Sequence, residues 1–282
     1  MKEQNMVDER FECLAVVFRL AGKENYGDLE LEYQRKVAEK FSDFIRHPAV
    51  EFIKNSVNLG YDSVLRFAVH IEKKDGKFTF INDINSLFAY AKWDKTLAES
   101  FLPLLNDFYI QANYAEFYNS QIPYFMEATK IFYEDFYGSI NWEWFKKYIP
   151  DITNLRCIYS LSSGNYSATV NDKYIYGCVW KKQGPVIIHE FCHSFTNEIA
   201  EKWYRENSEF RNLCDKSVNT EKHPFYPKGE SMAREYITTA YEIMYFNENE
   251  HHGYAGDENF VFYEGDGLPD IRKVYDMICK QE

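Results

Sequence analysis

Two histidines and a glutamate stand close together in the segment VIIHEFCHSF, residues 186–195, which is otherwise almost wholly apolar. His189 and His193 are four residues apart, and Glu190 follows the first histidine directly. This HExxH spacing is typical of zinc enzymes, because two imidazoles one helical turn apart can bind a single ion. Glu190 would then act as general base on a water molecule bound to that ion. We therefore expect a zinc (Zn2+) site with Glu190 as its catalytic residue.

A helical projection of this segment, at about 100° per residue, separates its polar and apolar side chains. The ionisable and amide groups share one face, which carries His189, Glu190, His193 and Asn197. The opposite stripe is apolar and is formed by Ile188, Phe191, Cys192, Phe195 and Ile199. The segment therefore predicts a helix with one face in the core and one face at the site.

A catalytic zinc site needs a third protein ligand, and no third histidine follows in HEFCHSFTNEI. The later segment GESMAREYITTAYEIMYF offers Glu230, Glu235 and Glu242. We expect Glu235 to be the ligand, because it lies in mid-helix in an apolar setting. Glu230 is explained without metal, since a helix start attracts carboxylates. Glu242 lies on nearly the same face as Glu235, so it is either a competing ligand or a hydrogen-bond acceptor for a ligand histidine.

The rest of the chain predicts the elements that must position these groups. Residues 28–74 and 92–149 favour helices, with Pro48, Pro103 and Pro123 starting or bending segments. Residues 155–180 alternate between apolar and polar side chains and contain turn residues, and this pattern predicts two or three strands. Helices are expected again at 185–205, at 230–246 and from about 269, with a long irregular loop between the last two. The expected fold is α+β and predominantly helical, with a helical region 1–152 and a catalytic region 153–282, unless the two form one continuous domain.

Composition restricts the class of protein. The chain has 282 residues, of which 45% are hydrophobic, so it can build a substantial core. Its net charge of -12 opposes nucleic-acid binding and attraction to anionic membranes. The six cysteines stand singly and are expected to be core thiols. Neither a signal segment nor an apolar run of membrane-spanning length is visible, so we expect a cytoplasmic protein from the chain as given, or an exported one if a leader was trimmed.

Other polar groups carry weaker signals. A hydrogen-bond donor for the transition state is commonly a Tyr or His beyond the glutamate helix, so His251, His252, Tyr254 and Tyr263 are candidates, although a solvated loop explains their segment equally well. His223 is expected in a loop, and His47 and His70 are expected to cap or flank helices. The strands predicted within residues 155–180 could provide a sheet edge along which an extended peptide binds, or they could simply pair with one another as hairpins.

The combination of HExxH with a glutamate on a later helix resembles the gluzincin metallopeptidases, whose thermolysin-like members carry the third ligand in an Exxx(D/S/T/A) helix. More closely, ERFECLAVVFRLAG, HPAVEFIKN, HEFCHSFTN and REYITTA together resemble a bacterial family of inferred zinc peptidases that is catalogued as a domain of unknown function. The resemblance implies a zincin-like sheet, His189, His193 and Glu235 as zinc ligands, and Glu190 as base. Asn197 matches an Asn of that family, whereas Thr239 stands where an Arg is frequent.

Three functions follow as hypotheses. The first is a zinc-dependent hydrolase, specifically a peptidase with peptide or protein substrates. The second is a non-catalytic zinc- or peptide-binding protein that retains the fold. The third has no metal site, and its histidines are simply hydrogen-bonded groups of a helix.

Overall fold

The computed structural model describes residues 5–60, 62–82, 84–89, 92–171, 173–180, 183–219 and 226–280, with only the backbone of Ala89 and His251. Helices predominate, and the described strands form one two-stranded and one three-stranded sheet, so the predicted α+β class is confirmed. None of the described helices combines the length and the apolar character that a membrane span requires.

The chain divides into two compact units. Unit 1 comprises Met1–Ser139 and Thr153–Ile187, and unit 2 comprises Ile140–Ile152 and Ile188–Glu282. This division differs from the expected regions 1–152 and 153–282, because the strands belong with the N-terminal half. Residues 140–152 belong to unit 2 because their aromatic side chains pack there. The rings of Trp144 and Tyr245 lie 5.2 Å apart, and those of Phe145 and Phe191 lie 6.0 Å apart.

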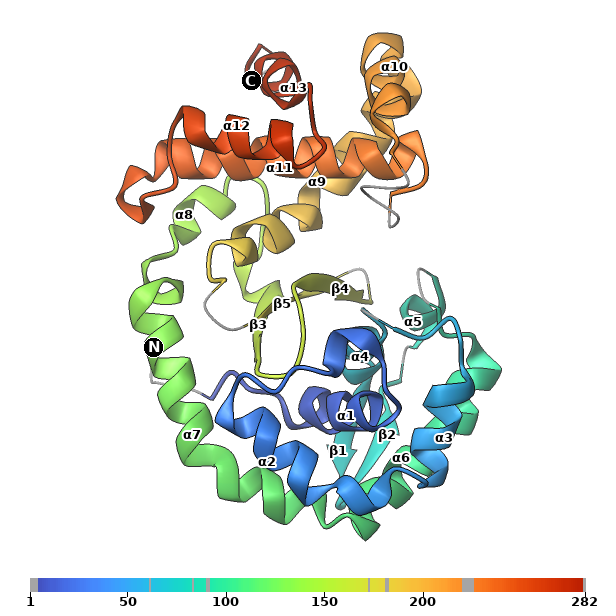
Figure 1. Cartoon of the computed structure of the whole chain (residues 1–282). Coiled ribbons are helices and arrows are strands. Elements are labelled where there is room, and N and C mark those ends of the chain that lie inside the picture. The colour runs from blue at the N-terminus through green and yellow to red at the C-terminus, as the bar shows by residue number, and fades with distance from the viewer. Residues whose placement is uncertain are drawn as a thin grey trace. The chain divides into compact units, whose positions relative to one another are not determined.

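Unit 1 is built mainly from helices that surround a buried first helix (Figure 1). They are α1 (Glu9–Leu20), α2 (Glu32–Lys40), α3 (Pro48–Asn55), α4 (Ser63–Ala68), α5 (Asn85–Ala89), α6 (Lys95–Gln111) and α7 (Tyr114–Asp135), with short 3-10 helices at Glu24–Tyr26, Ser42–Phe44 and Tyr137–Ser139. The expected helices did not include α1. Its residues 11–18 are buried on all sides, so the sequence lacks the polar face that marks an amphipathic helix.

A hairpin follows α4, and only its first strand replaces the end of the helical region expected at 28–74, because the segment DGKFTFIND, residues 75–83, itself predicts a turn and a short strand. Strands β1 (Ile71–Lys74) and β2 (Lys77–Phe80) pair antiparallel, and the turn residues Asp75 and Gly76 both have positive φ. Such an Asp-Gly turn matches the twist of two paired strands, which explains why a hairpin forms there. His47 caps α3 as expected, since its Nδ1 accepts a hydrogen bond from the amide of Ala49.

The predicted strand region is confirmed as three strands of unit 1. They are β3 (Leu155–Ser160), which follows a 3-10 helix at Ile152–Asn154, β4 (Tyr166–Val170) and β5 (Tyr174–Trp180). Strand β5 lies in the middle of the sheet, parallel to β3 and antiparallel to β4.

Unit 2 contains the two helices expected to carry the site. They are α9 (Val186–Glu206), which belongs to unit 2 from Ile188, and α11 (Gly229–Glu248). The other elements are α8 (Trp142–Phe145), α10 (Ser208–Ser217), a 3-10 helix at Glu250–His252, α12 (Asp257–Gly265) and α13 (Ile271–Cys279). Helices α10 and α13 pack against α11 (Figure 1).

Two of these elements correct the sequence analysis. Helix α10 was not expected, and the long irregular loop expected after α11 contains α12. Helix α12 has four acidic residues and two glycines within or directly beside it, so its local sequence is a weak helix signal. Its buried Phe260 lies 5.2 Å, ring to ring, from Tyr275 of α13. Tertiary packing against a neighbouring helix therefore stabilises α12 where intrinsic propensity does not.

Candidate metal centre

Helix α9 separates a core face from a polar face, as its sequence predicts. Ile188, Phe191 and Cys192 are fully buried. The histidine side chains on the other face are partly exposed, at 16% for His189 and 17% for His193. The packing of the apolar stripe thus fixes the rotation of α9 about its axis and directs both imidazoles to one side.

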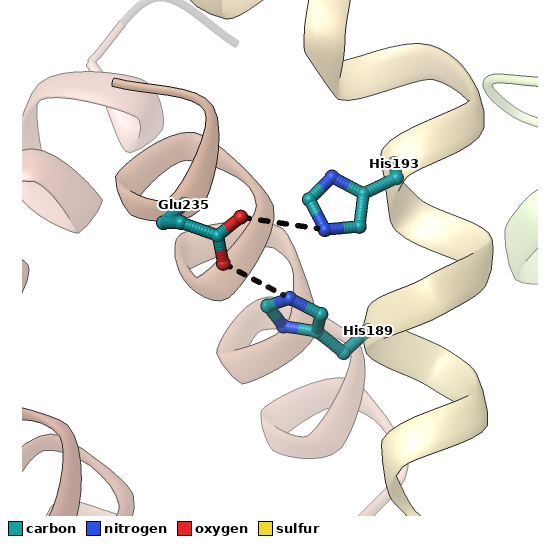
Figure 2. A group of neighbouring side chains, drawn as sticks. All are labelled: His189, His193 and Glu235. Atoms are coloured by element: carbon teal, nitrogen blue, oxygen red, sulfur yellow. Dashed lines mark ion pairs between the residues drawn. The ribbon is translucent and has the colours of Figure 1, made fainter. Parts of the chain in front are cut away.

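Glu235 of α11 lies opposite the two histidines and points at both of them (Figure 2). Its Oε2 is 3.4 Å from Nε2 of His189, and its Oε1 is 3.7 Å from Nε2 of His193. One ligand atom from each of the three residues can be chosen so that all lie within 4.8 Å of one another. We call His189, His193 and Glu235 the metal centre.

Two of the three ligand separations in the metal centre are close to those of a zinc site. Zinc is bound by histidine nitrogen and carboxylate oxygen at about 2.1 Å, and a tetrahedral arrangement separates neighbouring ligand atoms by about 3.4 Å. The two nitrogen-to-oxygen distances of 3.4 and 3.7 Å are close to that separation. Three protein ligands leave a fourth position for water or substrate, which is the arrangement of catalytic rather than structural zinc sites.

Glu242 contacts Nδ1 of His189, the ring nitrogen that does not contact Glu235. Its Oε2 is 2.9 Å from Nδ1 of His189, and the hydroxyl of Tyr263 donates to the same oxygen at 2.8 Å. Because an ionised carboxylate only accepts hydrogen bonds, Nδ1 of His189 must carry the hydrogen. The sequence left Glu242 open as a ligand or an acceptor for a ligand, and the observed contact is that of an acceptor.

His193 is supported by neutral groups instead. Its Nδ1 lies 3.2 Å from Oδ1 of Asn197, one turn further along α9. The hydroxyl of Thr238, from α11, lies 3.1 Å from the same nitrogen. Both contacts leave Nε2, the nitrogen that faces Glu235, available to the metal centre.

The electrostatics of the metal-free protein follow from these contacts. Burial lowers the pKa of His189, but hydrogen bonds to Glu235 and Glu242 outweigh it and raise that pKa well above its ordinary value. Burial raises the pKa of Glu235, but its hydrogen bond to His189 and the charges of both histidines bring it below its ordinary value. Burial lowers the pKa of His193. Both shifts favour an ion pair between His189 and Glu235, whose Nε2 and Oε2 are 3.4 Å apart, when no metal is bound.

Glu190, the expected general base, is 7% exposed and follows His189 on α9. At about 100° per residue it projects roughly 60° beyond His193 around the helix. It is not part of the group of three converging ligands. Glu230 is exposed in the first turn of α11, where the helix dipole accounts for it.

The candidate transition-state donors lie in different places. The hydroxyl of Tyr263 donates its hydrogen bond to Glu242. Nε2 of His252 lies 3.2 Å from the hydroxyl of Tyr245. Tyr254 is 44% exposed, with its ring near that of Phe246. The side chain of His251 and the whole of His223 lie outside the described part of the chain.

Two contacts of the centre were missed by the sequence analysis. Thr238 follows Glu235 by three residues, so helical spacing alone could have placed it on the same face. Tyr226, which precedes α11, hydrogen-bonds to Glu235. Nothing in the connecting segment distinguishes Tyr226 from the other 22 tyrosines of the chain.

Comparison with models of protein families, with curated proteins and with solved structures finds no match for this chain. The function must therefore be inferred from the site itself.

Proposed function

We propose that this protein is a zinc-dependent hydrolase that cleaves peptide bonds. The observation that carries the proposal is the convergence of His189, His193 and Glu235 from two helices on one point. Two imidazoles and one carboxylate are the ligand set of several zinc hydrolases. The sequence order of an HExxH helix and a later glutamate helix supports a zincin-like catalytic unit.

Each protein group has a separate task in this mechanism. A zinc ion, when bound, would polarise the scissile carbonyl and make a water molecule more acidic. Glu190 accepts the proton of the attacking water and passes it to the nitrogen of the leaving amine. Glu242, Asn197 and Thr238 hold the two imidazoles in place, so that both Nε2 atoms face Glu235.

One observation favours a second candidate, a non-catalytic zinc- or peptide-binding protein. Catalysis of this type usually requires a hydrogen-bond donor for the developing oxyanion. Tyr263, a sequence candidate for that role, instead donates to Glu242. Zinc binding and turnover must therefore be measured separately.

The test begins with the zinc content of purified protein and its activity on a mixed peptide library. We expect one zinc ion per chain, activity that disappears with a chelator, and recovery when zinc is added. Glu190→Gln should retain zinc and fold but lose about 10²- to 10⁴-fold in turnover, the usual contribution of a general base. Glu198→Gln, at an exposed position of the same helix, is the matched control and should retain activity.

The outcomes separate the hypotheses. Full activity in Glu190→Gln would refute the mechanism. Stoichiometric zinc without turnover of any library peptide would favour the binding protein. If the wild-type protein binds no zinc, the hypothesis that His189, His193 and Glu235 form a zinc site is refuted.

A further inference from the structure

A pair of buried hydroxyls connects α9 and α11 next to the metal centre. Thr196 and Thr238 are both fully buried, and their Oγ1 atoms are 2.7 Å apart. Thr196 also donates to the carbonyl of Cys192 at 2.9 Å, and Thr238 contacts Nδ1 of His193 at 3.1 Å. These contacts form one continuous chain from a helix carbonyl to a ligand imidazole.

Counting hydrogens gives this chain a direction. A hydroxyl has a single hydrogen to donate. Thr196 uses its hydrogen on Cys192, so in the contact between the two threonines Thr238 must be the donor. The hydrogen of Thr238 is thereby used, and its oxygen can only accept from Nδ1 of His193.

Asn197 Oδ1 is also an acceptor at this nitrogen, so both neighbours of Nδ1 require a hydrogen there. A neutral imidazole carries only one N–H. A hydrogen on Nδ1 leaves the lone pair on Nε2, which faces Glu235 at 3.7 Å.

We propose that Thr196 and Thr238 form a hydroxyl relay that fixes His193 in the tautomer required for metal binding, and that Thr238 is a positioning residue. The inference rests on the metal centre of the proposed function, but not on peptide hydrolysis. It distinguishes the two histidines, because a carboxylate holds His189 and neutral hydroxyl and amide groups hold His193.

The relay also explains why one helix, α11, carries several of the groups that contact the two histidines. Ligand Glu235, relay residue Thr238 and acceptor Glu242 lie at spacings of three and four residues, hence within about 60° of one face. A shift of α11 by one residue would rotate all three groups by about 100° and break every contact at once. Helix packing thus sets ligand position and ligand tautomer together.

The experiment uses the full chain with isotope-labelled histidine. Long-range proton–nitrogen NMR of the metal-free wild type should show the hydrogen of His193 on Nδ1. Thr238→Val keeps the side-chain volume but removes the hydroxyl, and it should give a mixture of tautomers and a zinc affinity reduced about tenfold or more. Thr238→Ser restores a hydroxyl and should recover both properties.

The matched control is Thr239→Val, the same change at the neighbouring buried position. It should leave the tautomer and the zinc affinity unchanged. If Thr238→Val does not fold, Thr196→Val tests the other end of the relay, where we expect a weaker shift in the same direction.

Two results would overturn the inference. One is a hydrogen on Nε2 of His193 in the metal-free wild type, which needs no variant to detect. The other is a folded Thr238→Val with wild-type tautomer and wild-type zinc affinity. A zinc-binding wild type without peptidase activity would refute the proposed function but leave this inference intact.

Discussion

Glu242 and His189 are joined across two helices, with Oε2 of the carboxylate 2.9 Å from Nδ1 of the imidazole. Glu242 is 4% exposed, and Tyr263 donates to the same oxygen. A carboxylate behind a ligand histidine orients the ring and strengthens the nitrogen that binds metal. The contact therefore assigns Glu242 a role that its position in the sequence left open.

Replacing this carboxylate should weaken zinc binding without unfolding the protein. In Glu242→Gln the side-chain oxygen can still accept from His189, but its negative charge is lost. We expect zinc affinity to fall by about 10- to 100-fold, measured by competition with a chromophoric chelator. Glu230→Gln, at an exposed position of the same helix, should leave the affinity unchanged. Equal affinities for wild type and Glu242→Gln would contradict this role.

Zinc binding should release a proton. In the metal-free protein, hydrogen bonds to Glu235 and Glu242 overcome burial and raise the pKa of His189 above its ordinary 6.5. His189 therefore still carries its second proton when the pH is slightly above that value, and a metal ion must displace it from Nε2. Zinc affinity should then rise with pH until the raised pKa is passed. Calorimetry in buffers of different ionisation enthalpy measures the released proton, and an affinity independent of pH from 6.5 upward would count against it.

Glu12 in unit 1 should make the free energy of unfolding depend on pH, independently of the metal centre. It is fully buried and accepts hydrogen bonds from the Leu161 amide and the Ser162 hydroxyl. Burial raises its pKa, so the folded protein holds this proton to a higher pH than the unfolded chain does. Its contribution to stability is complete below the ordinary value of 4.5 and is lost as the pH rises through the raised pKa.

A pair of variants checks this explanation. Glu12→Gln retains an oxygen for the Leu161 amide and cannot ionise, so its stability relative to wild type should increase as the pH rises. Glu12→Ala leaves that amide without an acceptor and creates a cavity, which should cost about 2–5 kcal/mol. Chemical denaturation between pH 5 and pH 8 is the measurement, at about 25 °C. A difference between wild type and Glu12→Gln that does not change with pH would exclude Glu12 as the titrating group.

Phe191 should matter to the fold of unit 2 without taking part in metal binding directly. It is fully buried on the core face of α9, with its ring 6.0 Å from those of Trp142 and Phe145. Phe191→Ala should lower the free energy of unfolding by about 3–5 kcal/mol, and Phe191→Leu by less. Excess zinc should recover part of the loss, because it binds only the folded form. Thermal melts of Phe191→Ala with and without zinc test this, and a melting temperature of the variant that does not rise with zinc would show that zinc does not stabilise its folded form.

The sequence predicted the parts of this protein that depend on local periodicity. Helices α9 and α11 lie close to their expected bounds, because a run of apolar residues at three and four spacing identifies a buried helix face. It missed α1, whose residues are buried on all sides, and α12, which is stabilised by packing against α13. Both helices form for reasons that no single stretch of sequence contains.

The same distinction applies to the site. The HExxH spacing determined that His189 and His193 share one face of a helix and that Glu190 is next to them, since this follows from the pitch of a helix alone. Which glutamate meets the histidines, which one supports them, and which hydroxyl contacts His193 depend on how α9 and α11 are rotated and aligned. Only the tertiary structure decided these points, because packing of the two apolar faces sets that alignment.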